Sequence, residues 1–331
     1  SQLLQRLEDS AGAEGPPNPS VLLALNLAGA GACSHCKELL QRLKETAVER
    51  AAKDMTSGEL ALYVLAFLSS CQSPRHIQAL GGTVDVLSWL QRRTDEEVAY
   101  LELEGAPQTT FYQLSLDVMA LCLEGTGIYE LAAIKLAKEL LGAGDQLSVD
   151  TRAAAALALT CAYGRAGTEG LMELRELLGE AVTGVANGFL DLQQQQNGLI
   201  GNIYSTGLAL QALTATAVFY APREWDCGQA FSAVLEQHLD QPTAIAQLLP
   251  ALLGRTYLDA AGLYCGTGTA APVARGVTAA HEAAPLITVY YSVTNELRGA
   301  PFHYSTRVCV AAGAVLLAVL QAAQEQDPAH F

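Results

Sequence analysis

The chain has 331 residues, of which 50% are apolar and 16% charged, so disorder is excluded and a large core can be buried. Its 19 Lys and Arg against 34 Asp and Glu give a formal net charge of −15, which argues against nucleic acid or an anionic membrane as a partner. No apolar run reaches the roughly 18 residues of a membrane span, and SQLLQRLEDS at the start lacks the pattern of a signal peptide.

A helical phrase recurs along the first three quarters of the chain. It has a small or polar start, followed by an apolar run in which an alanine precedes leucine or phenylalanine. These alanines are spaced by about 45 residues on average, and they are Ala24, Ala66, Ala120, Ala158, Ala212 and Ala251. Segments that are apolar nearly all round are typical of buried helices, so the phrase predicts six inner helices.

Amphipathic stretches separate these segments and predict half-exposed outer helices, because their apolar residues recur at three- and four-residue steps. They read KELLQRLKETAVERAAK, VDVLSWLQRRTDEE, LAAIKLAKELL, LMELRELLGEAV and QAFSAVLEQHL. One inner and one outer helix per repeat, six times over, predicts a mostly α protein built as a closed α6/α6 barrel of six helical hairpins. An open solenoid of helix pairs is the alternative, but six units without a polar capping repeat favour closure.

Polar groups stand at the start of each inner helix, where side chains cap unpaired backbone N–H groups or bind a ligand. They are Ser20, Ser57, Glu59, Tyr112, Gln113, Asp150, Thr151, Ser205, Thr206 and Thr243. Plain capping explains about half of such a set. Gln113, Asn202 and Gln247 are interpreted as poorer caps. Because an amide both donates and accepts, a ring of amides at a barrel mouth suits a ligand rich in amides or hydroxyls.

After Cys265 the helical pattern stops. Residues 266–285 contain proline, have no period and predict a linker. LITVYYSVTNELRG and TRVCV predict two strands, and AAGAVLLAVLQAAQEQ predicts a helix. The sequence therefore predicts a barrel domain over 1–265, a linker over 266–285 and an incomplete small β-rich (α+β) domain over 286–331, with an open sheet edge.

The motif search predicts neither a metal site nor a common enzyme class. Among eight cysteines, Cys33-Ser-His-Cys36 is a lone CxxC with no second pair at zinc-finger spacing. The chain has no HExxH, and it also lacks the GxGxxG, GxxxxGK[ST] and GxSxG signatures.

Several long segments in the same order carry a family resemblance. PNPSVLLALNLAGA, SGELALYVLA, FYQLSLDVMALCL, SVDTRAAAALALTC, NGLIGNIYSTGLALQAL, AQLLPALLGRTYLD and TVYYSVTNELRG resemble the vertebrate cobalamin carriers, the family of intrinsic factor, haptocorrin and transcobalamin. The similarity runs from about Pro17 to Phe331 and is greatest to the intrinsic factor–haptocorrin branch. The resemblance implies an α6/α6 barrel, a linker and a smaller β-rich domain, with cobalamin as cargo between the domains. It also implies a secreted, extracellular protein that transports vitamin B12 to a cell-surface uptake receptor.

Carried over residue by residue, the resemblance implies the cobalamin contacts. These are Thr109, Tyr112, Gln113, Asp150, Asn202, Ser205 and Gln247, nearly the set selected at the helix starts. Glu59 stands where transcobalamin-like members have glutamine, so its contact is not carried over. Gln146 occupies the place of a histidine that ligates cobalt in transcobalamin-like members. Because an amide is a poor cobalt ligand, no bond from the protein to the metal is expected.

The resemblance also pairs Cys71 with Cys265 and Cys122 with Cys161. Cys227 matches a family cysteine whose partner has no counterpart before Cys33, and a Cys33–Cys36 bridge, or one to Cys227, stays open. The family's second domain continues past the last residue of this chain. Cobalamin binding is therefore expected to be weak, or to be completed by a separate C-terminal fragment.

Two other classes of function compete with the carrier. α/α barrels also host glycosidases, which need two carboxylates facing one cleft, and Asp150 with Glu59 is the only such pair at helix starts. The third hypothesis is an interaction scaffold that kept the barrel and lost the ligand. The expectation adopted is a carrier, not an enzyme, with no nucleic acid partner and no membrane insertion.

Overall fold

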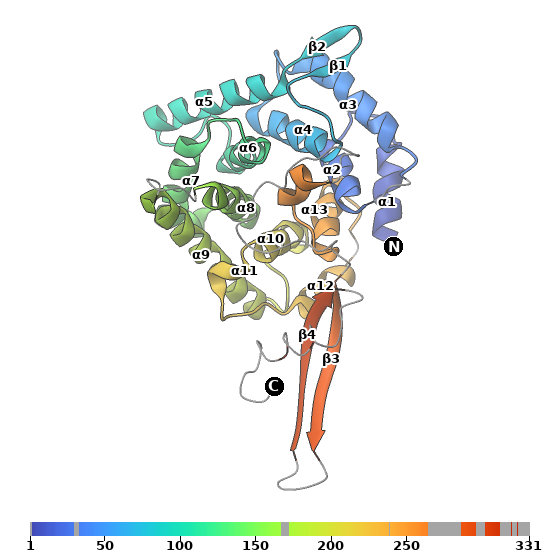
Figure 1. Ribbon diagram of the computed structural model, residues 1–331, viewed down its shortest axis with the longest axis vertical. Helices are drawn as coiled ribbons and strands as arrows, with labels where there is room; N and C mark the ends of the chain where they lie inside the picture. The colour runs from blue at the N-terminus through green and yellow to red at the C-terminus, as the bar shows by residue number, and fades with distance from the viewer. Residues whose placement is uncertain are drawn as a thin grey trace.

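The computed structural model is mostly helical (Figure 1). It describes residues 2–29, 33–166, 172–237, 239–263, 286–295 and 302–311, together with residues 319 and 323. The predicted linker over 266–285 and the proposed partner Cys265 lie outside these described residues.

Six buried helices form a closed ring. Each packs against the next in chain order, and the last packs against the first, so that the ring closes across more than two hundred residues (Figure 1). They are buried on nearly all sides, as the recurring apolar phrase predicts. They are α2 (Pro19–Leu27), α4 (Ser57–Ser69), α6 (Phe111–Glu124), α8 (Val149–Arg165), α10 (Ile203–Ala215) and α13 (Pro242–Leu252).

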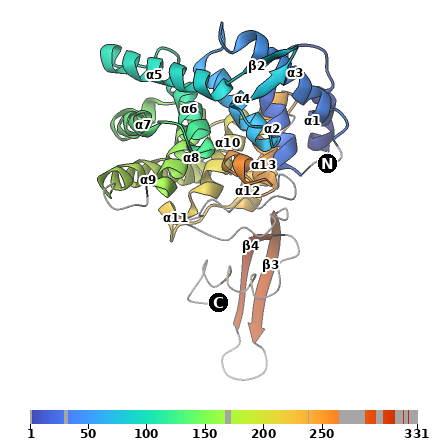
Figure 2. The ribbon, with the colours of Figure 1, turned by 45° about the horizontal axis from the view of Figure 1, so that its top comes forward.

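Outer helices cover the ring, each burying one stripe of its surface. All five amphipathic stretches are confirmed as helices, and a sixth outer helix at the N-terminus was not predicted. The order is thus outer before inner, and α1 packs against both α13 and α2, where the ring closes (Figure 2). They are α1 (Gln2–Ala11), α3 (Cys36–Arg50), α5 (Val86–Glu104), α7 (Glu130–Ala143), α9 (Met172–Gln195) and α12 (Cys227–Leu235), with the short α11 (Ala217–Tyr220) after α10.

The chain itself fills the middle of the ring. After α13 it forms the 3-10 helix η2 (Tyr257–Gly262), which packs against α2, α4, α6 and α8. Tyr257 is fully buried there, and its backbone N–H donates to Gln211 Oε1 of α10 at 2.9 Å. The centre is therefore core, and a ligand must bind at an end of the ring.

Two short elements interrupt the helices. A hairpin of β1 (Ile77–Ala79) and β2 (Gly82–Val84) joins α4 to α5 and was not predicted. Its turn places Leu80 and Gly81 at positive φ. The 3-10 helix η1 (Gly144–Gln146) leads into the loop before α8. Three-residue strands leave too few alternating positions to give a sequence signal.

Near the C-terminus, β3 (Leu286–Asn295) and β4 (Phe302–Ala311) pair antiparallel along their whole length. Both predicted strands are confirmed, but β4 is twice as long as the TRVCV segment that predicts it. The hairpin extends away from the helical ring (Figures 1 and 2). Of the predicted helix AAGAVLLAVLQAAQEQ, the first residue, Ala311, instead ends strand β4. The other described residues of this segment, Val319 and Ala323, are helical and buried with Val308 and Val310.

Disulfides follow part of the expected pattern. Cys122–Cys161 is confirmed and joins the inner helices α6 and α8. Cys33 pairs with Cys36, which settles the alternative left open by the sequence. Cys71 and Cys227 are also disulfide-bonded.

Candidate functional site

The inner helices begin at one end of the ring, and their N-caps are not the residues singled out as ligand contacts. Before five of the six inner helices, the side chain of the preceding residue accepts from the backbone N–H groups of the helix, as preferred capping residues do; Gln241 before α13 makes no such bond. The caps are Asn18, Thr56, Thr110, Ser148 and Asn202. Asp150, Ser205 and Gln113 lie inside the first turns, so their side chains are not engaged in capping.

Asn202 is the exception, and its interpretation as a poor cap is wrong. Its Oδ1 accepts from the backbone N–H groups of Tyr204 at 2.8 Å and Ser205 at 3.0 Å. Asparagine is among the best N-caps because its short side chain reaches the first turn. The exposed Asn202 therefore stabilises the start of α10 while standing at the rim of the site.

Four predicted contact residues come together from four inner helices. Ser205 Oγ of α10 donates to Asp150 Oδ2 of α8 at 2.8 Å. Gln247 Nε2 of α13 donates to the Tyr112 hydroxyl of α6 at 3.4 Å. Burial raises the pKa of Tyr112 to about 12, with a further rise from the nearby Asp150 carboxylate and an opposing effect of Gln247. Residues up to 135 positions apart thus form one polar cluster.

Gln113 joins the neighbouring helix instead. Its Oε1 accepts from the Gly58 backbone N–H of α4 at 3.3 Å. A Cβ on Gly58 would lie 2.6 Å from Gln113 Cγ, so only glycine allows this approach. The amide of Gln113 is thereby held at the junction of α4 and α6.

Thr109, like Gln113, makes no hydrogen bond to the polar cluster within the described residues. Its backbone N–H donates to Glu97 Oε2 of the outer helix α5 at 3.0 Å. Its hydroxyl is buried and has no hydrogen-bond partner among the described residues. The loop before α6 is thus anchored outward, toward α5.

A cavity of about 390 Å³ opens on the side of the mouth formed by α2, α4 and α6. Its wall combines prolines with polar groups and includes the predicted Tyr112 and Gln113. The lining is Pro16, Pro17, Pro19, Thr46, Arg50, Thr56, Gly58, Glu59, Leu62, Tyr63, Thr110, Tyr112, Gln113 and Leu116. Tyr112 therefore belongs both to this cavity and to the polar cluster on the opposite side.

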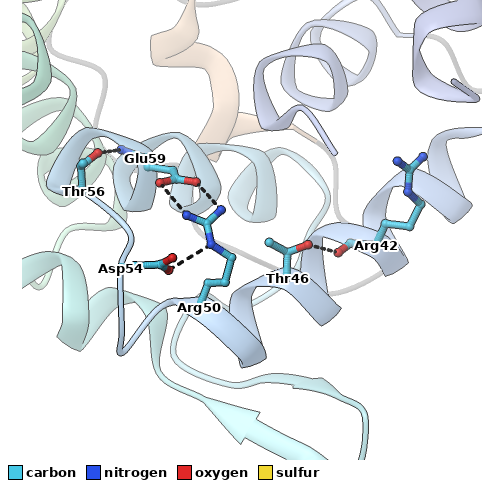
Figure 3. A network of polar contacts seen from close by, with 6 residues as sticks. All are labelled: Arg42, Thr46, Arg50, Asp54, Thr56 and Glu59. Atoms are coloured by element: carbon cyan, nitrogen blue, oxygen red, sulfur yellow. Dashed lines mark hydrogen bonds and ion pairs between the residues drawn. The ribbon is translucent and has the colours of Figure 1, made fainter. Parts of the chain in front are cut away.

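Arg50 is a lining residue that sequence reasoning missed. At the end of α3 it donates to Glu59 Oε1 at 2.9 Å and to Asp54 Oδ1 at 3.0 Å (Figure 3). Burial raises the pKa of Tyr63 beside this network to about 12, and Glu59 adds to the rise. The only available signal was the Arg50–Asp54 spacing of four residues in a charged helix, which is also common on plain surfaces.

The carboxylates that could have served a glycosidase have separate partners. Glu59 is paired with Arg50, whereas Asp150 accepts from Ser205 two inner helices further along the ring. Within the described residues no group of three or more His, Cys, Asp and Glu side chains could hold a metal. Over the same part of the chain, no helix is both long and apolar enough to cross a bilayer.

The arrangement is suited to binding through hydrogen bonds. It offers fixed amides and hydroxyls, together with one carboxylate at Asp150 and an ion-paired one at Glu59. Such groups recognise a ligand with many amide and hydroxyl groups, since each protein donor or acceptor finds a complement.

Comparison with known proteins places these features in a family. Residues 1–282 match the family model described as eukaryotic cobalamin-binding protein. Cobalamin binding intrinsic factor from Rattus norvegicus is 35% identical over 97% of this chain and 75% of its own length. Transcobalamin-1 from Homo sapiens is 32% identical over 94% of this chain and 73% of its own length. The structure of haptocorrin in complex with Cbi matches with a TM-score of 0.66 and 28% identity, covering 98% of this chain and 80% of that one.

Proposed function

Because this chain belongs to the eukaryotic cobalamin-binding protein family, we propose that it is a cobalamin carrier, which binds cobalamin at the mouth of the helical ring. The observation that carries the proposal is the polar cluster of Tyr112, Asp150, Ser205 and Gln247. Four inner helices contribute to it, and it adjoins the cavity at Tyr112. Packing of the six inner helices against one another requires only apolar contacts, so it does not account for a cluster of polar side chains at the end of the ring.

The fold and domain boundaries follow as part of this proposal. The closed ring of six inner helices, covered by six outer ones, is an α6/α6 barrel over residues 1–265. Residues 266–285 act as the linker, and 286–331 contribute a β-rich domain that begins with the β3–β4 hairpin. The packing of α13 against α2 supports closure, and the paired strands support the second unit.

Capture works through preorganised hydrogen bonds. Asp150 and Gln247 hold their positions through Ser205 and Tyr112 before a ligand arrives, so little side-chain entropy is lost on binding. The amide groups of cobalamin donate to Asp150 and exchange hydrogen bonds with Gln113 and Gln247. Thr109 and Asn202 extend the contact along the rim. Hydrogen bonds to the charged Asp150 contribute most, about 1.5–3 kcal/mol each.

Cobalt keeps its upper ligand from solvent or from cobalamin itself. The exposed Gln146 stands on η1, and its amide is a weak ligand for the metal compared with an imidazole. The site therefore recognises the organic periphery of the cargo. The carrier is secreted, and it transfers its cargo to cells through an uptake receptor. The confirmed Cys122–Cys161 disulfide is consistent with an oxidising, extracellular compartment.

The testing experiment is a visible-absorbance titration of the purified chain with hydroxocobalamin, followed by gel filtration. We expect co-elution at one equivalent, with the spectrum of water-ligated cobalt. An imidazole-type spectrum on co-elution would show that a histidine reaches the metal and would contradict the assignment of Gln146. Absence of co-elution at micromolar protein would overturn cobalamin capture by this chain alone, and would leave completion of the site by a separate fragment or an interaction scaffold.

A further inference from the structure

The sequence motif that cobalamin binding leaves unused is Cys33-Ser-His-Cys36. Its two cysteines form a disulfide with their Cα atoms 5.5 Å apart, and Cys36 is the first residue of α3. The last residue of that helix, Arg50, lines the mouth cavity. Fourteen helical residues span about 20 Å, so the disulfide lies well away from the proposed cobalamin site.

This disulfide is open to attack by a solvent thiol. Both cysteines are only partly buried, and Ser34 and His35 between them are exposed. By contrast, the Cys122–Cys161 disulfide, where α6 meets α8, has one fully buried cysteine, Cys122, and one partly buried cysteine, Cys161. Exchange requires a thiolate to approach along the sulfur–sulfur bond, so burial closes one direction of attack on Cys122–Cys161 and neither direction on Cys33–Cys36.

The start of α3 also favours the product of reduction. The first backbone N–H groups of a helix have no partner within it, and together they carry a partial positive charge. His35 at the N-cap position makes no side-chain capping bond to them. A thiolate on Cys36 would lie at this end, and a helix N-terminus lowers the pKa of a cysteine thiol. A thiol with a lower pKa is a better leaving group in exchange.

The fold depends little on this bridge. It joins residues only three positions apart, whereas Cys122–Cys161 spans 39. In the loop-entropy description, a short loop constrains the unfolded chain less than a long one. The helix itself is anchored by Leu39 and Leu43 in the core, and the His35 ring lies against Gly12 just after α1. Opening the bridge therefore leaves α3 in place.

From access, helix position and loop size together, we infer that Cys33–Cys36 is a thiol–disulfide exchange site whose substrates are small thiols and dithiols. This activity is independent of cobalamin binding. A dithiol thiolate attacks the Cys33 sulfur, a new sulfur–sulfur bond forms, and the electron pair of the broken bond leaves on Cys36. The second thiol of the reagent then attacks the mixed disulfide as its thiolate and releases Cys33. The dithiol loses two electrons and becomes a cyclic disulfide, while the protein gains two electrons and two protons.

The test treats the whole folded chain with graded dithiothreitol, followed by alkylation and peptide mass spectrometry. We expect Cys33 and Cys36 to be half-modified at a concentration about tenfold below that needed for Cys122 and Cys161, with unchanged helical circular dichroism. Modification of Cys122 and Cys161 at the same or a lower concentration would overturn the inference. A Cys33→Ser/Cys36→Ser double variant should keep the helical signal and lose only the early step.

A charge swap tests the contribution of the helix end. Glu38 lies in the first turn of α3, and its carboxylate opposes a thiolate there. Glu38→Gln should raise the alkylation rate of the reduced pair at neutral pH about two- to threefold. Glu49→Gln makes the same change of net charge near the other end of the helix and should leave the rate unchanged. Equal effects of both variants would contradict a role of the helix N-terminus.

Discussion

At the residue scale, the polar side chains at the starts of the inner helices are of two kinds. Some cap the helix, and others are proposed to bind a ligand. The caps precede the inner helices, so Asp150 and Ser205 in the following turns are held only by each other. Deeper in the same helices, Asp117 of α6 is fully buried. Its oxygens make no hydrogen bond of normal geometry within the described residues. We therefore assign Asp150 and Ser205 to the proposed binding site and expect Asp117 to affect stability.

Asp150→Ala should weaken cobalamin binding by about 10- to 100-fold, because a charged hydrogen-bond acceptor is removed from the mouth. The barrel should stay folded, since Ser148 rather than Asp150 caps α8. Glu130→Ala is the matched control, because Glu130 is the first-turn acid of the outer helix α7 and has the same favourable position at a helix start. Equilibrium titration of both variants checks this, and equal affinities would show that the site assignment is wrong.

Asp117→Asn should stabilise the protein at neutral pH. Burial raises the pKa of Asp117 well above its ordinary value, Ser57 and Thr94 act against the rise, and Glu97 adds to it. The folded state therefore keeps a proton that the unfolded state loses above about pH 4, and stability falls as pH rises toward the folded pKa. The slope is at most about 1.4 kcal/mol per pH unit from this group.

Urea unfolding between pH 4 and 8 measures this effect. The asparagine variant should lose the slope that Asp117 contributes, while Asp95→Asn, at an exposed position on α5, should keep it. An unchanged slope in the Asp117 variant would mean that the carboxyl is already ionised in the folded protein.

At the element scale, small residues set how closely the inner helices approach. A Cβ on Gly207 of α10 would lie 2.8 Å from the Leu248 backbone of α13. These helices meet one residue away from Gln247, which contributes to the mouth. Backbone contact at this point thus links ring packing to the position of a ligand-binding amide.

Gly207→Ala should therefore destabilise the fold by about 1–3 kcal/mol, since the two helices must move apart. It should also weaken cobalamin binding by displacing Gln247. Gly184→Ala on the outer helix α9 is the control, because a Cβ there meets nothing within 4 Å. That change should stabilise by about 0.5–1 kcal/mol through helix propensity. Urea unfolding of both variants gives the comparison, and effects of the same sign would contradict the packing argument.

At the scale of the whole molecule, stability depends on closing the ring. Segments from the two ends of the barrel meet at the junction: Arg6 of α1 donates to the Leu239 carbonyl at 2.9 Å, and Asn18 Nδ2 donates to Thr243 Oγ1 at 3.3 Å. Between neighbouring inner helices, Cys122–Cys161 restrains the unfolded chain over 39 positions. Contacts between residues far apart in the sequence cost much conformational entropy to form. A covalent bond between such residues therefore has a large effect on stability.

Replacing Cys122 and Cys161 by alanine should lower the free energy of unfolding by about 3–4 kcal/mol, as the loop-entropy model gives for a loop of this length. The Cys33→Ser/Cys36→Ser variant removes a disulfide that closes only a short loop. Its free energy of unfolding should therefore fall clearly less. Denaturant unfolding without reductant distinguishes the two. A similar loss in both variants would show that loop length is not the source of the stabilisation.

The sequence by itself determined the inner helices and their number, whereas the cobalamin contacts that it suggests stay predictions. Burial on all sides demands continuous apolar runs, and these runs recur visibly from Ala24 to Ala251. The family resemblance pointed to Asp150 and Gln247 as proposed contacts in the same way, because its motifs are local. These features need no knowledge of which helix neighbours which.

Only the tertiary structure decided how those residues are used. The pairing of Tyr112 with Gln247 joins positions far apart in sequence, and the role of Arg50 at the cavity depends on where α3 ends. α1 is the sixth outer helix because it packs against both α13 and α2, which are far apart in the sequence. Such contacts arise from packing across the ring, and no short stretch of sequence encodes them.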